Sequence, residues 1–273
     1  MVFPCISSTG MILCCAQIES SWEDPEATLA RAERCIGRAS RNGGDLVCFP
    51  EQFATGWDPS SLRHVQGLDG PLVGHLQSLA EEYSIAILGS LRKYSVPRPE
   101  NTCIAISPQG KILAEYSKCH LFSPAGEDRV YQRGNAIAPF TLAGMTLGIA
   151  ICYDLRFASI FALYADAGVD AVLVPAAWPA SRLSHWELFI RARAVEYQVY
   201  VAGINTTGVT PVDTYNGGTM VADPTGAPLF IAGAGEGVYS CEMSREFVER
   251  VRNAFPVKKD RHPDIIQSDK TRP

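Results

Sequence analysis

The sequence predicts an α/β protein in which mixed β-sheets are covered by helices on the outside. Short apolar runs typical of buried strands outnumber the segments with helical periodicity. Both hairpins and strand–helix–strand units occur along the chain. The 273 residues, of which 47% are hydrophobic and 19% charged, are enough for one large core. No internal repeat or low-complexity linker interrupts them, so we expect a single domain.

The first half of the chain alternates apolar runs with helical segments. Asp24 and Pro25 are typical of a helix start, with the aspartate as cap, and Asn42-Gly43-Gly44 is typical of its end. Pro71 opens a second helix, because the apolar residues after it recur at the helical period. Apolar runs predict strands over residues 11–18, 46–49, 85–91, 102–107 and 111–116.

The second half begins with a predicted hairpin, formed by residues 136–142 and 145–151. Ser184 and Glu187 have the spacing of a capping box, which predicts a long helix from Ser184 to about residue 198. A terminal β-meander and a short helix complete the fold. The remaining predicted elements are a helix over residues 159–167 and strands over residues 171–174, 200–205, 216–222, 227–231 and 237–241.

The domain is expected to span residues 11–264, between an N-terminal extension of residues 1–10 and a C-terminal tail of residues 265–273. The extension lacks the positive segment of a signal peptide. No apolar stretch approaches the length needed to cross a membrane, so no membrane partner is expected. The net charge is −5 and there is no basic stripe, which argues against a nucleic-acid partner.

The cysteine pattern argues against both disulfides and metal. Nine cysteines, an odd count without a secretion signal, do not suit a disulfide framework, so we expect a reducing, cytoplasmic location. No Cys-x-x-Cys pair or His cluster has metal-ligand spacing, which argues against a zinc site and against a thioredoxin-like protein. Four cysteines lie in apolar runs and are expected in the core: Cys14, Cys15, Cys48 and Cys103.

Cys152 ends the apolar run Gly148-Ile149-Ala150-Ile151 and is followed by a polar stretch. The run predicts a buried strand, and in layered α/β proteins the ends of strands open into the crevice where ligands bind. A thiol held there could act as a nucleophile. Most buried cysteines are inert, so this position alone leaves both interpretations open.

Two further strand ends carry ionisable residues. Glu51 follows Pro50 after an apolar run, and a carboxylate in such surroundings could act as a base near neutral pH. An exposed loop glutamate is the alternative. Lys118 follows the strand that ends at Tyr116 and could stabilise an oxyanion, although a surface lysine is the commoner case.

Cys119 and His120 do not form a catalytic dyad in this interpretation, because neighbours on an extended segment point to opposite faces.

Three segments together resemble the motifs of the nitrilase (carbon–nitrogen hydrolase) superfamily, in that family's order. They are Phe49-Pro50-Glu51-Gln52-Phe53-Ala54-Thr55-Gly56, Tyr116-Ser117-Lys118-Cys119-His120-Leu121-Phe122 and Cys152-Tyr153-Asp154-Leu155-Arg156-Phe157. The resemblance extends from Met11 to about Asp264. It implies a four-layer α-β-β-α sandwich that needs no metal or organic cofactor and forms a homodimer or higher homo-oligomer through its helices.

The resemblance also implies a role for each residue. Glu51 would take the thiol proton, and Cys152 would attack the carbonyl carbon. Lys118 and the backbone N–H of Tyr153 would stabilise the oxyanion. Glu127 matches the family's second glutamate, which positions the lysine and the substrate, and Asp128 beside it is the alternative.

The segments after Cys152 are similar to the ω-amidase-like branch, which acts on short dicarboxylate monoamides such as succinamate. Tyr153-Asp154 favours an amidase, since true nitrilases usually carry Trp-Glu there. Arg156 and Arg182 are candidates for binding the free carboxylate, because arginine suits carboxylates. A structural salt bridge is the alternative for Arg156, and Trp178 could form either a pocket wall or part of the core.

The expected function is therefore a thiol amidohydrolase acting on a small-molecule amide. A deaminated-glutathione amidase and an N-carbamoyl amino acid hydrolase are the alternatives on the same fold. A non-catalytic binding protein on the same scaffold is the alternative from another class.

Overall fold

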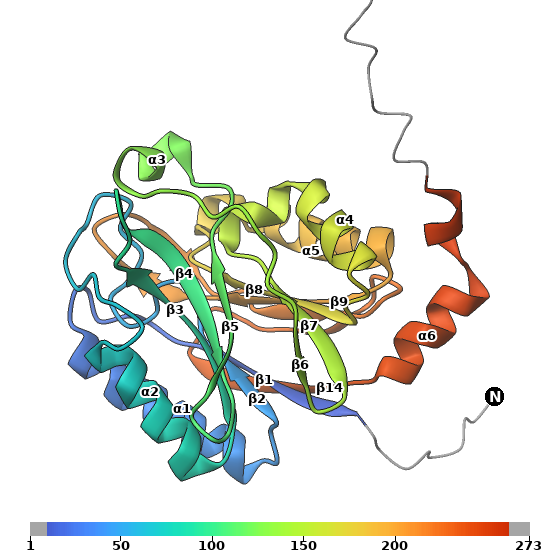
Figure 1. The fold of residues 1–273 in the computed structure, drawn as a ribbon, viewed down its shortest axis with the longest axis horizontal. Coiled ribbons are helices and arrows are strands. Elements are labelled where there is room, and N and C mark those ends of the chain that lie inside the picture. The colour runs from blue at the N-terminus through green and yellow to red at the C-terminus, as the bar shows by residue number, and fades with distance from the viewer. Residues whose placement is uncertain (1–9, 262–273) are drawn as a thin grey trace, which may run out of the picture.

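Two six-stranded sheets lie face to face, and helices cover the outer face of each (Figure 1). The computed structural model describes residues 10–261, so the predicted tail and nearly all of the predicted N-terminal extension lie outside the described residues. The helices α1 (Pro25–Arg41) and α2 (Pro71–Tyr83) lie on one side, and α4 (Ala158–Asp166) and α5 (Leu183–Tyr197) lie on the other. This four-layer arrangement confirms the predicted fold class.

The first sheet has the strand order β14, β1, β2, β3, β4, β5. Its three central strands are parallel, and the outer pairs are antiparallel. Since α1 and α2 connect the parallel strands, this half is a β-α-β-α-β unit with added edge strands. The bounds of its strands are β1 (Met11–Gln17), β2 (Leu46–Cys48), β3 (Ala86–Lys93), β4 (Glu100–Ile106), β5 (Ile112–Ser117) and β14 (Gly237–Met243).

The second sheet repeats this pattern with the order β13, β12, β9, β8, β7, β6. Its central strands are again parallel and are connected through α4 and α5. The strands are β6 (Phe140–Leu142), β7 (Met145–Ile149), β8 (Ala171–Ala176), β9 (Tyr200–Asn205), β12 (Met220–Ala222) and β13 (Pro228–Ile231). The short ribbon of β10 (Thr207–Val209) and β11 (Thr214–Asn216), the helices α3 (Glu127–Val130) and α6 (Arg245–Ala254), and four 3-10 turns complete the described fold.

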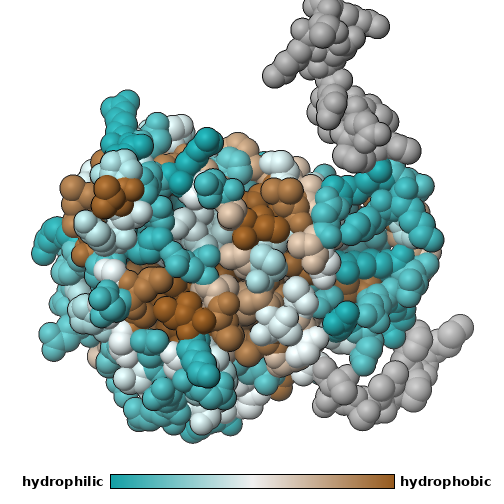
Figure 2. All heavy atoms as spheres, in the orientation of Figure 1, coloured by the Kyte–Doolittle hydropathy of each residue, from teal (hydrophilic) through white to brown (hydrophobic). Residues whose placement is uncertain are grey.

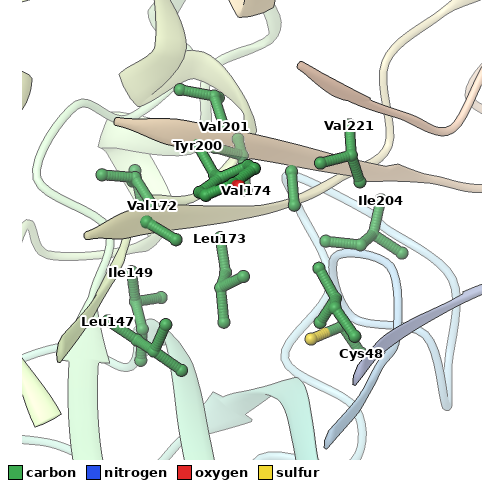
Figure 3. Close-up of a cluster of buried hydrophobic side chains, with 14 of the residues drawn as sticks. Cys48, Leu147, Ile149, Val172, Leu173, Val174, Tyr200, Val201, Ile204 and Val221 are labelled. Atoms are coloured by element: carbon green, nitrogen blue, oxygen red, sulfur yellow. The ribbon is translucent and has the colours of Figure 1, made fainter. Parts of the chain in front are cut away.

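The core has one layer between the sheets and others beneath the helices. Along β1, Leu13 and Cys15 belong to the cluster between the sheets, whereas Cys14 and Ala16 pack with residues of α1 and α2. This alternation follows from the two-residue period of a strand. In Figure 3, Leu173 points away from its sheet into the space between the sheets. Cys14, Cys15, Cys48 and Cys103 are all buried, as predicted.

Helix starts and ends agree with the sequence prediction in the first half. The side chain of Asp24 accepts a hydrogen bond from the Ala27 N–H at 3.1 Å, so it caps α1 as expected. Pro71 begins α2 as predicted. The prediction of a capping box at Ser184 is wrong, because α5 begins at Leu183 and has no side-chain cap. A 3-10 turn, Ala180–Arg182, leads into that helix, and its Ala180 carbonyl accepts a hydrogen bond from the Leu183 N–H.

The predicted terminal meander is also wrong. Gly217 and Gly218 have positive φ angles of 63° and 80°, and they divide the expected strand 216–222 into β11 and β12. The last strand, β14, then crosses to the first sheet and pairs along its whole length with β1. The hairpin strand expected from residue 136 begins only at Phe140, since Pro139 has no N–H for a ladder and the Ala138 N–H donates to the Tyr164 hydroxyl.

Candidate active site

The candidate site lies where strand ends of both sheets meet. Glu51 follows β2 and Lys118 follows β5, which runs in the same direction as β3 because each is antiparallel to β4. Cys152 follows β7, and Ala177 follows β8. Carboxyl ends of strands that run in one direction lie at one edge of a sheet, which brings these residues to a common crevice. Within the described residues, no group of three His, Cys, Asp or Glu side chains is arranged to hold a metal ion.

Two carboxylates share one ammonium group in this crevice. Lys118 Nζ donates to Glu51 Oε1 at 2.7 Å and to Glu127 Oε2 at 2.9 Å. All three residues are buried, with at most 1% of the surface of each exposed. The alternative of an exposed loop glutamate or a surface lysine is therefore wrong for this chain. Glu127 faces inward and Asp128 is exposed, so the geometry favours Glu127 over its neighbour.

The environment separates the pKa values of the two carboxylates. Burial raises the pKa of Glu51, and the neighbouring Glu127 charge adds to this, although Lys118 opposes it. Burial would also raise the pKa of Glu127, but Lys118, the Phe122 N–H and Asn101 outweigh it, so that pKa is lowered. For Lys118, burial would lower the pKa, but the two carboxylates outweigh it and raise it. The lowered pKa favours ionised Glu127 beside the Lys118 ammonium, and the raised pKa makes Glu51 the carboxylate better suited to take up a proton.

Cys152 begins a 3-10 turn, Cys152–Arg156, and has a φ of 45°. A positive φ is costly for a residue with a side chain, and such strain concentrates at functional sites. Burial raises the pKa of the thiol well above its usual value; Glu51 raises it further, while Lys118 lowers it. The thiol therefore favours its protonated form, and the Glu51 carboxylate is close enough that each group influences the pKa of the other.

The Asp154 carboxylate holds this strained turn in place through hydrogen bonds. It is buried and accepts hydrogen bonds from the Tyr116 hydroxyl at 2.7 Å, the His120 N–H at 2.8 Å and the Ile151 N–H at 2.9 Å. These bonds join the strand before the nucleophile to the segment that carries Lys118. The ring nitrogen Nδ1 of His120 also lies 2.8 Å from Asp154 Oδ1. His120 is therefore paired with Asp154 and does not form a dyad with Cys119.

A pocket of about 120 Å³ opens next to Cys152. Aromatic and apolar side chains form most of its wall, and four charged side chains, Lys118, Arg156, Arg182 and Asp213, also line it. Its lining includes Trp57, Phe122, Tyr153, Arg156, Arg182 and Tyr215. Trp178 is buried in the core and also lines this pocket, so both interpretations of it hold.

Arg156 and Arg182 both line the pocket. The alternative of a structural salt bridge for Arg156 is wrong, since among residues 10–261 it has no carboxylate within 4.0 Å. Its guanidinium lies over the rings of Trp178, at 4.8 Å, and Phe189, at 5.3 Å. Burial lowers the pKa of Arg156, and the charge of Arg182 lowers it further, so the two cations are near neighbours.

Three contributions to the site were missed by the sequence analysis. Asn101 Nδ2 donates to Glu51 Oε1 at 2.8 Å and to Glu127 Oε1 at 3.0 Å. Trp57 Nε1 donates to Glu127 Oε1 at 3.3 Å, and the Ala177 N–H donates to Glu51 Oε2 at 3.1 Å. Asn101 is the second residue of β4, between Glu100 and Thr102, so it is a weak signal, and a backbone N–H leaves no signal in sequence.

Comparison with known proteins identifies the family. The sequence model of the family described as "Carbon-nitrogen hydrolase" matches residues 13–253. The chain belongs to this family. The resemblance to the nitrilase superfamily is thereby confirmed, and with it the class of enzyme, a carbon–nitrogen hydrolase of the amidase type. No helix among the described residues has both the length and the apolar character of a membrane span.

Two curated relatives are similar over most of their length. The 2-oxoglutaramate amidase of Bacillus subtilis is 30% identical over 92% of this chain and 97% of its own. A deaminated glutathione amidase of Synechocystis sp. is 31% identical over 84% of this chain and 90% of its own.

Two solved structures have the same fold. Nit3 of Saccharomyces cerevisiae, a member of branch 10 of the nitrilase superfamily, matches with a TM-score of 0.85 and 28% identity, covering 94% of this chain and 99% of its own. An amidase variant from Nesterenkonia sp. AN1, with acrylamide added to its active-site cysteine, matches with a TM-score of 0.81 and 25% identity, covering 91% and 99%.

Replacing Asn101 with leucine tests its contact with both carboxylates. Loss of the amide donor disfavours ionised Glu51, so the acidic limb of the pH dependence of kcat/KM, expected above pH 4.5 in the wild type, moves to higher pH. We expect about a 10-fold lower kcat/KM at neutral pH, which corresponds to the loss of one hydrogen bond to a charged group. An unshifted limb in a variant that melts like the wild type would contradict this role.

Proposed function

We propose that this protein hydrolyses a linear amide to a carboxylate and ammonia through a thioester on Cys152. The observation that carries the proposal is the convergence of a protonated thiol, a buried carboxylate of raised pKa and a buried ammonium group at one pocket. The Michael addition of acrylamide to the active-site cysteine of the Nesterenkonia amidase supports a nucleophilic cysteine in that relative.

In the first half-reaction, Glu51 takes the proton of the Cys152 thiol as sulfur attacks the amide carbon. The carbonyl oxygen becomes an oxyanion, which Lys118 Nζ and the backbone N–H of Tyr153 stabilise. That N–H lies in the first turn of the 3-10 segment, where N–H groups have no acceptor within the turn. Glu51 then gives its proton to the nitrogen, the C–N bond breaks, and ammonia leaves.

In the second half-reaction, Glu51 takes a proton from water, and the resulting hydroxide attacks the thioester carbon. The same donors stabilise the second oxyanion. The C–S bond breaks, and the sulfur recovers its proton from Glu51. Glu127 keeps its charge throughout and holds Lys118 in place, because its pKa is lowered by the contacts it receives from Lys118, Phe122 and Asn101.

The preferred substrate in this proposal is a short dicarboxylate monoamide. Arg156 and Arg182 both line the pocket, neither has an acidic partner within 4.0 Å among residues 10–261, and a carboxylate would relieve their repulsion. The similarity to a 2-oxoglutaramate amidase supports this class. The similarity to a deaminated glutathione amidase keeps that larger amide as the alternative, with an N-carbamoyl amino acid as another. A pocket of about 120 Å³ favours the shorter acyl chain.

We also propose a homodimer and a cytoplasmic location. Apolar side chains are exposed on the helices over the second sheet, with Leu163 on α4 at 56% and Leu188 and Val195 on α5 at 63% and 50%. Such groups on neighbouring helices suit a self-complementary contact. Figure 2 shows that hydrophobic areas on one face alternate with hydrophilic ones. The eight cysteines among the described residues are all unpaired, which supports a reducing compartment.

Replacing Cys152 with alanine removes the nucleophile. We expect ammonia release from succinamate to fall by about 10⁴-fold or more, because without the thiol no thioester forms. Cys119→Ala is the matched control, since Cys119 is half-buried outside the pocket and should leave the rate unchanged. Substantial turnover by the Cys152 variant would refute the covalent mechanism.

Replacing Arg182 with methionine tests the carboxylate site. For succinamate we expect kcat/KM to fall about 10- to 100-fold, as expected for a lost charged hydrogen bond, while butyramide, which lacks the carboxylate, changes by less than about twofold. Arg245→Met, an exposed change on α6, is the control. An equal effect on both amides, or best wild-type turnover on N-carbamoyl amino acids, would argue against this substrate class.

Replacing Leu188 with glutamate tests the oligomer. The wild type should have the mass of a dimer by light scattering at about micromolar concentration, and the charge on the proposed contact should shift it toward a monomer. A monomeric wild type would contradict the proposal.

A further inference from the structure

Arg92 is a buried arginine that does not line the pocket at Cys152. It belongs to β3, and 1% of its surface is exposed. An arginine is rarely buried unless it is paired, because its charge is costly away from water. Its counter-ion is Glu23, whose Oε1 lies 2.9 Å from Nη1. This pair accounts for the charge of Arg92, but the other donors of the guanidinium point elsewhere.

Two of those donors hold one segment of the chain at two places. Arg92 Nε donates to the side-chain oxygen Oε1 of Gln52 at 3.0 Å, and Nη2 donates to the backbone carbonyl of Gly56 at 2.9 Å. A guanidinium is planar and its N–H groups have fixed directions, so the two bonds fix the spacing between these residues. Arg92 thus holds segment 51–57 near both of its ends.

Each end of segment 51–57 carries a residue of the candidate active site. Glu51, the proposed base, directly precedes the first residue that Arg92 contacts. Trp57 directly follows the second, and its Nε1 donates to Glu127 Oε1 at 3.3 Å. The residues that Arg92 holds are therefore the chain neighbours of the base and of a donor to the second carboxylate.

The backbone beside the base is strained. Gln52 has a φ of 46°, in the left-handed region that is costly for a residue with a side chain. Two residues of β3 hold it there, since the Ser90 hydroxyl accepts a hydrogen bond from the Gln52 N–H and Arg92 donates to its side chain. Positions 90 and 92 lie on one face of the strand, because side chains alternate along it. Strain of this kind persists only where the surroundings determine the conformation.

A purely structural role for Arg92 is the alternative. Its Nη1 also donates to the Ser61 hydroxyl and to the Arg63 carbonyl, both at 2.9 Å, so the residue joins a second loop as well. All of these bonds, and the pair with Glu23, use Nη1, whereas Nε and Nη2 contact segment 51–57. A substitution can therefore disturb one set of contacts and leave the other in place.

We infer that Arg92 is a positioning residue for the reaction, which holds segment 51–57 so that Glu51 lies within reach of the Cys152 thiol and Trp57 within reach of Glu127. It acts through these neighbours and is not itself a catalytic residue. The inference rests on the proposed function, because the group that it places is the proposed base. Loss of the contact should leave substrate binding in place and slow the proton transfer by Glu51, since small displacements of a reacting group cost much of its rate.

The test is a double-mutant cycle with succinamate as substrate. Gln52→Met removes the oxygen that accepts from Nε, and Arg92→Lys keeps the positive charge but loses the planar set of donors. We expect each to lower kcat about 10-fold with KM changed by less than about twofold, and the double variant to fall no further than either single one. Ser61→Ala, which removes a bond of Arg92 on the Nη1 side, is the matched control and should leave kcat within about twofold.

The cycle separates the two roles. If Arg92 were only structural, all three substitutions would lower the melting temperature and the amount of folded protein, while kcat per labelled active site stayed at the wild-type value. Effects of Gln52→Met and Arg92→Lys that added in the double variant would mean that the two residues act separately. A change in KM alone would mean that the contact shapes the pocket. Each of these results overturns the inference.

Alkylation of Cys152 by iodoacetamide separates this inference from the amidase proposal, because it needs no amide turnover. The thiol reacts once Glu51 has taken its proton, so Gln52→Met should slow labelling of Cys152 about 10-fold, as peptide mass spectrometry would show. If the wild type released no ammonia but this difference persisted, the amidase proposal would fail and the role of Arg92 would stand. If turnover were normal and neither Gln52→Met nor Arg92→Lys changed kcat or labelling, the reverse would hold.

Discussion

The buried contact between Lys118 and two glutamates is the constraint on which the rest of the site depends. Three ionised groups without access to water are tolerated only when each is paired and hydrogen-bonded. One ammonium cannot neutralise two carboxylates, so the cluster has a deficit of positive charge. Asn101, the Ala177 N–H and the Trp57 Nε1 supply neutral donors that compensate for it. Burial, together with this deficit, explains why Glu51 has a raised pKa and is suited to proton transfer.

The cluster of Lys118 with the two glutamates and the Cys152 thiol come from different halves of the chain. Each half is a β-α-β-α-β unit with antiparallel additions, and the two sheets pack face to face. Glu51, Lys118 and Glu127 come from the first half, and Cys152 comes from the second. Neither half holds a complete site, so the packing between the sheets sets the distance between base and nucleophile. Leu173 in Figure 3 belongs to that packing.

Rigid supports surround the strained turn at Cys152. Asp154 ties the turn to the segment of Lys118, and Arg193 on α5 donates to the backbone carbonyls of Leu155, at 3.3 Å, and Arg156, at 3.0 Å. A positive φ at a residue with a side chain persists only where its surroundings determine it. The nucleophile is therefore held by contacts from both sheets and a helix, which suits a reaction that needs the thiol within reach of both the base and the oxyanion donors.

The sequence by itself determined the fold class, most of the helices and strands, and the three motif residues, because period, turn residues and motif order are local signals. Only the tertiary structure decided the path of β14 into the first sheet, the inward position of Glu127 rather than Asp128, and the contacts of Asn101. It also decided that Arg156 has aromatic rather than acidic neighbours, and that Arg92 holds segment 51–57 near both of its ends. These features depend on which residues contact one another across the sheets. Such contacts arise from packing between segments far apart in the chain, which local sequence signals do not describe.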